Sequence, residues 1–417
     1  MTRYRVRPSG PLHGTVKVSG ASKNSGTKHM AAALLASGRT TLHNLPHVSD
    51  LEVMVDVLRS IGATVELGDG DVVIDATAEL TPEAPYELVS RMRASFNVLG
   101  PLVARCGHAR VALPGGDLIG SRKVDMHLRG LEAMGAHVGV DHGFVVARAP
   151  RLAGARIVLE FPSVGATENL MCAAVLAKGS TVIENAAREP EVTDLAAFLD
   201  RMGGQVIGAG TSTIEIEGVD DLYAVESEIM GDRIEAGTLL MACGLAGGEI
   251  ELVGTRLEHL EIVSMKLCDM GMRVSPTPDG LWAQSPSRLR AVDIATLPHP
   301  GFATDFMPLA VALLSVADGS AIVTENIYDG RFQFADELVR MGADIRTEGR
   351  HAIVRGVERL SSAPVIAADV RAGAALVLAG LVADGETIVH GVDHVDRGYH
   401  DLPATLRDLG ADVERLD

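Results

Sequence analysis

Six basic side chains occur where the surrounding sequence gives little reason for a positive charge. Each lies beside glycine or at the edge of an apolar helix, and they are Lys23, Arg93, Arg122, Arg331, Arg371 and Arg397. A cation in such a setting either pairs with a neighbouring acid or faces an anionic ligand, and the residue alone leaves both interpretations open. Their spread over both halves of the chain favours a two-domain enzyme that binds a multiply anionic substrate in a cleft.

Two aspartates are candidates for moving protons. Asp117 lies in the segment from Pro114 to His127, whose glycines suit a loop that closes over a ligand and whose Arg122 and Lys123 could meet phosphate. Asp305 has apolar neighbours, where a carboxylate serves either as a helix N-cap or as a general base. A charged, glycine-rich loop is a weak signal by itself.

Two further segments place small residues directly before an apolar helix. They run from Ser19 to Gly26 and from Pro162 to Glu168. The free N–H groups at a helix start attract anions, and Lys23 adds a point charge to the first segment. The competing interpretation is an ordinary serine-capped helix.

A repeat of about 70 residues must position these groups. The pattern Leu-x-x-(Met/Ile/Leu)-Gly occurs six times, ending at Gly62, Gly135, Gly203, Gly271, Gly342 and Gly410, and a second glycine precedes each copy, at Gly38, Gly107, Gly179, Gly248, Gly319 and Gly385. Subtracting the numbers of the first set gives intervals of 73, 68, 68, 71 and 68 residues. Each copy reads as strand, Ala-rich helix, strand, polar helix, strand and strand, with glycine ending the helices.

The Ala-rich helices are apolar nearly all round, for example from Ala166 to Ala177 and from Ala372 to Gly380, so they should be buried. The polar ones, such as Asp194 to Met202, are amphipathic. Buried helices surrounded by sheet predict a two-domain, inside-out α/β barrel with three repeats in each domain. A six-unit solenoid is the alternative, but solenoid units are shorter, about 20–50 residues.

Composition excludes several classes of protein. The net charge of −18 argues against a nucleic-acid binder, and 3% aromatic residues leave little material for base stacking. No apolar stretch approaches the ~20 residues that span a bilayer, and the first residues lack a signal peptide's apolar core, so we expect a cytoplasmic protein without membrane contact. The four scattered cysteines fit reduced thiols better than a metal or disulfide site, and no metal cluster or cofactor fingerprint is visible.

In the order of its segments the chain resembles the UDP-N-acetylglucosamine enolpyruvyl transferases, the sister family of EPSP synthase. The resemblance covers essentially all 417 residues and rests on Lys23-Asn24, Met92 to Ser95, Leu99 to Leu102, Pro114 to His127, Ser163 to Thr167, Glu184 to Glu191, Asp232 to Glu235, Thr304-Asp305, Asp369 to Ala372 and Asp396 to Tyr399. It implies an inside-out fold with one domain over 22–229, another over 1–21 and 230–417, and the active site in the cleft between them.

The resemblance also implies a reaction. The 3-hydroxyl of UDP-N-acetylglucosamine attacks C2 of phosphoenolpyruvate while C3 is protonated, and phosphate leaves from a tetrahedral ketal. This is the first committed step of peptidoglycan synthesis, on which cell-wall growth, cell shape and division depend. Neither metal nor cofactor is needed, and the implied partners are the two small substrates.

Residue roles follow from the same resemblance. Asp305 would be the base at the acceptor hydroxyl and Asp117 the proton donor, with Lys23 as the third catalytic group. The groups that would bind phosphoenolpyruvate are Lys23, Arg93, Arg122, Arg331, Arg371 and Arg397. Those that would bind the acceptor are Asn24, Arg93, Arg122, Val124, Asp125, Ser163, Val164, Gly165, Asp305 and Ile327.

The chain departs from the family pattern at four positions. Asp117 replaces the cysteine of most relatives, and since a carboxyl group is not the soft nucleophile that fosfomycin alkylates, we expect insensitivity to that epoxide. Ser22 is an extra residue before Lys23, while Lys123 replaces a proline and Glu160 a frequent lysine. These departures leave the acceptor open, and two alternatives remain: enolpyruvyl transfer to another uridine nucleotide such as UMP in nucleoside-antibiotic synthesis, and a non-catalytic nucleotide-sugar sensor.

Overall fold

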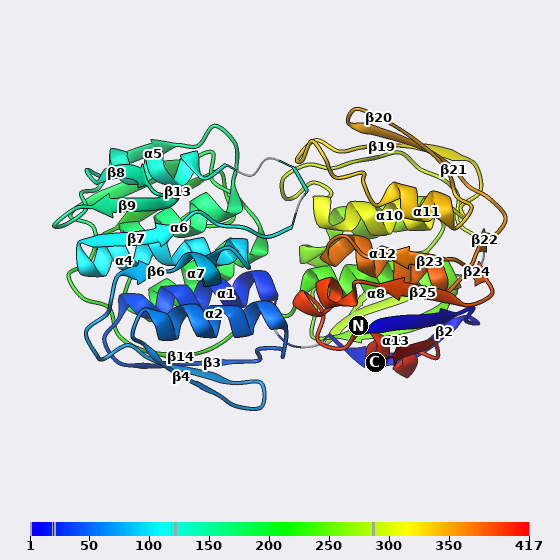
Figure 1. The fold of residues 1–417 in the computed structure, drawn as a ribbon, viewed down its shortest axis with the longest axis horizontal. Helices are drawn as coiled ribbons and strands as arrows, with labels where there is room; N and C mark the ends of the chain where they lie inside the picture. Colours follow the sequence, from blue (N-terminus) through cyan, green and yellow to red (C-terminus); the bar gives the residue numbers. More distant parts are fainter. Residues whose placement is uncertain are drawn as a thin grey trace. The chain divides into compact units, whose positions relative to one another are not determined.

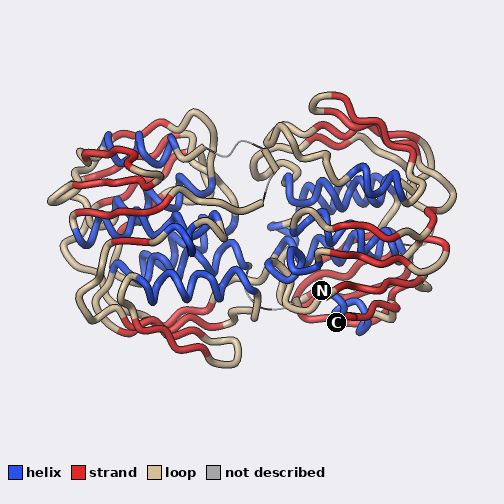
Figure 2. Tube along the Cα trace, in the orientation of Figure 1, coloured by secondary structure: helices blue, strands red, loops and turns tan. Residues whose placement is uncertain are grey.

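The computed structural model describes residues 2–18, 20, 22–117, 119–120, 123–285 and 288–416. The chain divides into two compact units. The N-terminal unit comprises Gly20–Gly116 and Arg122–Met230, and the C-terminal unit comprises Met1–Ser19, Asp117–Ser121 and Gly231–Asp417. Within each unit, helices occupy the middle and strands lie outside them (Figures 1 and 2). The inside-out α/β architecture predicted from the repeat is therefore confirmed.

The strands of the described residues form six four-stranded sheets and one two-stranded sheet. In the N-terminal unit the sheets are β14 (Glu226–Glu228), β3 (Arg39–His43), β5 (Val72–Asp75) and β4 (Thr64–Leu67); β6 (Glu83–Ala84), β7 (His108–Ala112), β9 (Phe144–Arg148) and β8 (His137–Asp141); and β10 (Arg156–Val158), β11 (Ser180–Glu184), β13 (Thr213–Glu217) and β12 (Gln205–Ile207). Each sheet has one parallel pair and two antiparallel pairs. One repeat of the sequence thus supplies the three antiparallel strands of each small sheet, and in the first sheet the parallel edge strand β14 comes from the end of the unit.

The C-terminal unit repeats this plan. Its four-stranded sheets are β16 (Arg273–Thr277), β17 (Gly280–Ser285), β15 (Gly248–Val253) and β2 (Leu12–Lys17); β18 (Ile294–Ala295), β19 (Ser320–Thr324), β21 (His351–Arg355) and β20 (Asp344–Glu348); and β23 (Pro364–Ile366), β25 (Thr387–His390), β1 (Arg3–Arg7) and β26 (Asp412–Leu416), with β22 (Leu360–Ser361) and β24 (Ala383–Asp384) as the short pair. The first strands of the chain complete sheets of the last repeats, because β1 pairs with β25 and β26, and β2 pairs with β15.

The described residues form α-helices and short 3-10 helices (η) in both units. In the N-terminal unit they are α1 (Lys23–Ala32), η1 (Ala33–Leu35), α2 (Ser49–Ser60), α3 (Tyr86–Val89), η2 (Arg93–Val98), α4 (Leu99–Cys106), α5 (Asp125–Ala133), α6 (Val164–Ala174) and α7 (Pro190–Arg201). In the C-terminal unit they are α8 (Arg233–Ala246), η3 (Leu257–His259), α9 (Glu261–Met270), η4 (Thr304–Phe306), α10 (Met307–Leu314), α11 (Ala335–Arg340), α12 (Val370–Gly380), η5 (Val392–Arg397) and α13 (Leu402–Asp408).

The burial expected of the Ala-rich helices is confirmed. Every residue of α10 and α12 is buried, as is α6 from Ala166 onward. The polar helix α7 is amphipathic, with Leu195 and Phe198 buried and Asp200 exposed. Each unit has its own hydrophobic core, and burying this apolar surface is the main force holding the helices inside the sheets.

The glycines that close the Leu-x-x-(Met/Ile/Leu)-Gly pattern end their helices as predicted, each at the C-cap or directly after it. In the second set Gly107 is the C-cap of α4, but the other five glycines lie two to five residues past the end of their Ala-rich helix, at or near the start of a strand, so for them the prediction is wrong. All twelve glycines of the two repeat sets have positive φ, from 73° at Gly107 to 137° at Gly38. Residues with a Cβ adopt this conformation only at a cost, so the backbone explains why one residue type recurs. Among the described residues, no helix combines the length and apolar character needed to cross a membrane.

Candidate active site

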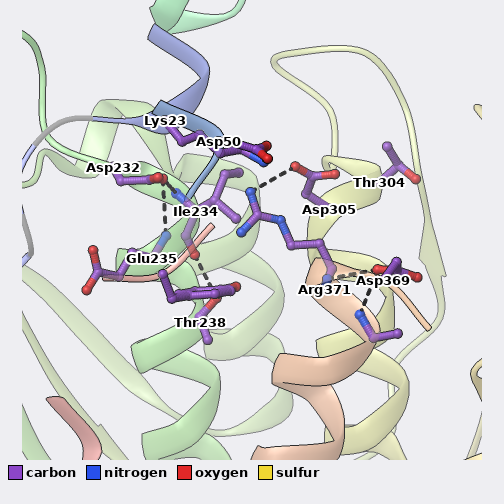
Figure 3. A network of polar contacts seen from close by, with 12 residues as sticks. Lys23, Asp50, Asp232, Ile234, Glu235, Thr238, Thr304, Asp305, Asp369 and Arg371 are labelled. Atoms are coloured by element: carbon purple, nitrogen blue, oxygen red, sulfur yellow. Dashed lines mark hydrogen bonds and ion pairs between the residues drawn. The ribbon is translucent and has the colours of Figure 1, made fainter. Parts of the chain in front are cut away.

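In the C-terminal unit, the carboxylate of Asp305 lies between two arginines. Its Oδ1 is 3.1 Å from Arg331 Nη2. Its Oδ2 is 3.4 Å from Arg371 Nη2 (Figure 3). Both guanidinium groups are buried, whereas the Asp305 side chain keeps 28% of its surface exposed. A partly exposed acid flanked by two fixed cations is suited to a charged ligand, because the cations stay in place when the ligand arrives.

A buried carboxylate organises the loop that carries Arg331. Glu325, 1% exposed, accepts hydrogen bonds from the backbone N–H of Ile327 at 2.7 Å and of Tyr328 at 3.0 Å. It also accepts from the hydroxyl of Thr304 at 2.7 Å, and that hydroxyl accepts from Arg331 Nη1 at 2.9 Å. Glu325 thereby links Thr304, the residue before Asp305, to the loop that carries Arg331.

Arg371 is set by the start of its own helix. Asp369 is the N-cap of α12, and its carboxylate accepts from the backbone N–H of Arg371 at 2.8 Å and of Ala372 at 2.9 Å (Figure 3). Burial alone would lower the pKa of Arg371, but electrostatic interactions with Tyr399, Asp305 and Asp232 outweigh it and raise that pKa. The guanidinium therefore remains positive.

Asp117 contacts Arg397 directly, through Oδ1 and Nη1. Gly120 lies against the loop that carries Arg331, since a Cβ on Gly120 would be 3.2 Å from Asp329 N and 3.3 Å from Gly330 N. Gly398, which follows Arg397, packs against Arg371, because a Cβ on it would be 3.4 Å from Arg371 Nη1. These close approaches bring the two candidate proton carriers and three arginines into one region of the C-terminal unit.

In the N-terminal unit, Lys23 opens α1 and pairs with an acid from the next helix. Its Nζ is 2.9 Å from Oδ2 of Asp50, whose side chain is only 4% exposed (Figure 3). Ser22 is the N-cap residue, but its side chain makes no capping hydrogen bond, so the serine-capped interpretation of this helix is wrong. The Ser22 backbone N–H instead donates to Met230 O at 2.9 Å, where the chain leaves this unit.

Five of the residues expected to hold the acceptor, Val124, Asp125, Ser163, Val164 and Gly165, lie at the starts of α5 and α6. Val124 and Asp125 begin α5, and Ser163 caps α6, where its hydroxyl accepts from Ala166 N–H at 3.3 Å. A Cβ on Gly165 would be 3.5 Å from the His127 ring of α5, so the two helix starts are neighbours. Two adjacent helix N-termini favour negatively charged groups such as phosphates.

Arg93 joins this region from η2. Its Nη2 donates to the carbonyl oxygen of Lys123 at 2.9 Å, directly before Val124. Asn24 lies one residue after Lys23 on α1, and its carbonyl oxygen accepts from Lys28 Nζ at 3.0 Å. The N-terminal unit therefore combines helix starts with basic side chains.

Beneath these helix starts lies a buried polar layer. Burial, with the positive charges of Arg93 and Lys28, lowers the pKa of His127 to about 3. Asn169 donates from Nδ2 to His127 Nδ1 at 3.1 Å, which fits a neutral imidazole. Glu168 is 3.3 Å from Lys28 Nζ, and burial raises the pKa of this carboxyl to about 7 although Lys28 opposes the shift.

Several of these contacts have no clear signal in the sequence. The predicted site does not include Asp50, Glu325 or the pair of Lys28 with Glu168, although Asp50 lies in the first turn of a polar helix and Glu325 directly follows a β-strand. Acidic residues are common at helix starts and strand ends, so their presence there does not indicate a functional site. Arg122, expected to bind both substrates, lies outside the described residues, and the expected roles of the other candidates stay predictions.

The structure also shows the surroundings of Lys123 and Glu160, the two remaining departures from the family pattern. Lys123 is exposed, and its backbone oxygen accepts from Arg93. Glu160 pairs with Arg129 of α5, which also lies 3.6 Å from Asp125. The negative charge of Glu160 is thus balanced by an arginine next to the expected acceptor site.

Across the residues that the structure describes, no group of three or more His, Cys, Asp or Glu side chains could hold a metal ion. The four cysteines, Cys106, Cys172, Cys243 and Cys268, are free thiols.

Comparison with known proteins agrees with this architecture. Residues 6–406 match the family model of EPSP synthase (3-phosphoshikimate 1-carboxyvinyltransferase). Proteins named UDP-N-acetylglucosamine 1-carboxyvinyltransferase are 53% identical in Corynebacterium jeikeium, over 97% of both chains, and in Mycobacterium tuberculosis, over 99% of both chains. Among solved structures, the enolpyruvyl transferase NikO from Streptomyces tendae has a TM-score of 0.87 and 26% identity, covering 99% of this chain and 98% of its own. EPSP synthase from Acinetobacter baumannii, at 18% identity and a TM-score of 0.74 over the whole of both chains, shares the fold.

Proposed function

The chain belongs to the EPSP synthase family, and from this premise we propose that it transfers the enolpyruvyl group of phosphoenolpyruvate to the 3-hydroxyl of UDP-N-acetylglucosamine, releasing phosphate. Relatives named UDP-N-acetylglucosamine 1-carboxyvinyltransferase match at 53% identity along nearly the whole chain, which supports this acceptor over shikimate 3-phosphate. The reaction opens peptidoglycan synthesis. The free thiols of the chain suit a reducing compartment, and we place the protein in the cytoplasm.

One observation carries the chemical part of the proposal: two carboxylates lie among three arginines within the C-terminal unit. Asp305 is paired with Arg331 and Arg371, and Asp117 contacts Arg397. The donor carries a phosphate and a carboxylate, so it needs preorganised cations, and its reaction needs one group to accept a proton and another to give one.

The proposed steps use these groups as follows. Asp305 accepts the proton of the acceptor hydroxyl while the oxygen of that hydroxyl bonds to C2 of phosphoenolpyruvate. Asp117, in its protonated form, gives a proton to C3. In the tetrahedral ketal, the Asp117 carboxylate takes a proton back from C3, the C–H electron pair forms the new double bond, and phosphate leaves with the electron pair of its bond to C2. Arg331, Arg371 and Arg397 balance the charge of the donor throughout.

Asp117 and the donor would compete for one guanidinium. Arg397 contacts Asp117 in the structure, and an anionic group of phosphoenolpyruvate would take the same position. We infer that Asp117 leaves Arg397 when the donor binds, which frees it to reach C3. Closure of the surrounding loop would also exclude water from the reacting atoms.

The N-terminal unit is proposed to bind the acceptor. Asn24, Arg93, Val124, Asp125 and the segment from Ser163 to Gly165 supply amide, guanidinium and carboxylate groups beside two helix starts. A pyrophosphate suits the helix N-termini, and a carboxylate can accept a hydrogen bond from a uracil N–H. Lys23 would assist the donor, and Ile327 of the C-terminal unit would contact the acceptor.

Phosphate release from phosphoenolpyruvate tests the proposal. Purified protein should release phosphate with UDP-N-acetylglucosamine, and much more slowly with UMP, and mass spectrometry should find the enolpyruvyl ether. Faster release with UMP would point to the nucleoside-antibiotic type of acceptor, which Lys123 and Glu160 left open. Binding of UDP-N-acetylglucosamine without phosphate release would instead support a sensor.

A further inference from the structure

Beside Arg397, a tyrosine and an arginine from two strands meet an aspartate from the 3-10 helix η5. The hydroxyl of Tyr4 donates to Asp396 Oδ1 at 2.5 Å, and Arg415 Nη2 lies 2.6 Å from the same oxygen and 3.1 Å from the Tyr4 hydroxyl. The Arg415 guanidinium also stacks 5.3 Å from the centre of the Tyr4 ring. Tyr4 is fully buried although it lies near the chain's beginning.

The sheet brings Tyr4 and Arg415 to this point. They are cross-strand partners on β1 and β26, so their side chains share one face of the sheet. Their neighbours, Arg5 and Glu414, are the next pair and point to the other face, where they form an ion pair of their own. The same two strands therefore carry one pair that reaches Asp396 and one that does not.

Asp396 belongs to the short element that presents Arg397. The 3-10 helix η5 starts after Gly391, whose φ is 70°, and ends before Gly398. Short 3-10 helices have poor hydrogen-bond geometry, so their side-chain anchors matter. Val392 and Val395 anchor η5 in the hydrophobic core, and Asp396 anchors the residue next to Arg397.

We propose that Tyr4 and Arg415 are positioning residues that hold Arg397 in register for the anionic donor by fixing Asp396. This inference rests on the proposed function, in which Arg397 meets phosphoenolpyruvate. Burial and the Asp396 carboxylate both raise the pKa of Tyr4, so its hydroxyl keeps its proton and continues to donate. The first and last strands of the chain thus act on a residue of the site without touching substrate.

Steady-state kinetics of three variants test the inference. Tyr4→Phe keeps the ring and removes one hydrogen bond to a charged group, so KM for phosphoenolpyruvate should rise by roughly tenfold, while KM for the nucleotide changes less than about twofold. Arg415→Met should show the same selective rise, and Arg415→Lys, which retains the charge, should restore part of the affinity. A double Tyr4→Phe/Arg415→Met variant should be less impaired than the product of the single effects, because both act through Asp396.

Glu414→Gln is the matched control. It alters the adjacent cross-strand pair of the same strands, so it reports any general loosening of β1 and β26. Equal values of KM for phosphoenolpyruvate in Tyr4→Phe and Glu414→Gln would overturn the inference. An equal rise in both KM values of Tyr4→Phe would also overturn it, since that pattern indicates a structural defect.

Hydrogen exchange separates this inference from the proposed function. Backbone amides of residues 392–398 should exchange faster in Tyr4→Phe than in Glu414→Gln, whatever reaction the protein catalyses. If the wild-type protein releases no phosphate, the proposed function fails and the donor role of Arg397 fails with it. If the wild type is active but exchange and KM are unchanged in Tyr4→Phe, only the positioning role fails.

Discussion

The two units handle negative charge in different ways. The C-terminal unit holds Asp305, Asp117 and their arginine partners as fixed pairs of side chains, with Arg331 and Arg371 buried. The N-terminal unit relies on the starts of α5 and α6 and on basic side chains near them. Paired side chains can exchange protons and partners, whereas helix starts can only attract and orient an anion. We expect the C-terminal unit to control the rate of the chemical step and the N-terminal unit to control affinity for the acceptor.

The largest effect is expected for Asp305→Asn. This change keeps the volume of the side chain and removes the proposed base, so kcat should fall by about 10²–10⁴-fold. Single-turnover phosphate release measures it. Asp344→Asn, at an exposed ion pair with Arg355, is the control and should leave kcat unchanged. A loss below threefold in Asp305→Asn would remove the assignment of the chemical step to the C-terminal unit.

Fosfomycin tests the nature of the group on the loop. A carboxyl group is a poor nucleophile toward the epoxide, so the wild-type protein should keep its activity and its mass after incubation with the drug. Asp117→Cys should gain the mass of one fosfomycin molecule and lose activity with time. A covalent adduct on Asp117 of the wild type, or its inactivation with saturation kinetics, would contradict this expectation.

A smaller and different effect is expected in the N-terminal unit. Asp125→Asn removes the carboxylate at the start of α5, and KM for UDP-N-acetylglucosamine should rise by roughly tenfold with kcat nearly constant. The ion pair of Asp125 with Arg129 is largely exposed, so its loss alone should matter little. Glu132→Gln, at the other end of α5, is the control. A fall in kcat without a change in KM would break the proposed division between the units.

The last effect is on stability rather than on catalysis and concerns the buried layer below the helix starts. His127 has a pKa of about 3 when folded, against 6.5 as its ordinary value, so between these values the unfolded chain binds more protons. Stability linked to this residue is present above pH 6.5 and is lost as the pH falls toward 3. At pH 5 the loss should be about 2 kcal/mol.

His127→Asn should remove this part of the acid dependence while keeping an acceptor for Asn169. Urea unfolding of wild type and variant at pH 7.5 and pH 5 measures the difference between the two pH values, so a constant packing defect cancels. His137→Asn, exposed on β8, is the control. An unchanged pH dependence in His127→Asn would show that burial and the nearby positive charges lower the pKa of His127 less than the structure indicates.

Much of the fold follows from the sequence because the responsible forces are local. The glycines at about 70-residue intervals specify where helices end, since the positive φ of positions such as Gly107 is a property of the residue itself. The apolar composition of α12 similarly requires burial whatever its neighbours are. The cations of the site could also be found, because an isolated charge beside glycine or apolar residues is conspicuous in one dimension.

Only the tertiary structure decided which charges meet. Asp305 pairs with Arg331 and Arg371, Lys23 with Asp50, and Tyr4 with Asp396 across 392 residues of chain. Nothing in the spacing of these residues specifies such pairs, because they arise when separate helices and loops pack around the core of each unit and β1 inserts between β25 and β26. Coulomb attraction depends on distance in space, and the sequence determines that distance only through the packing of the whole unit.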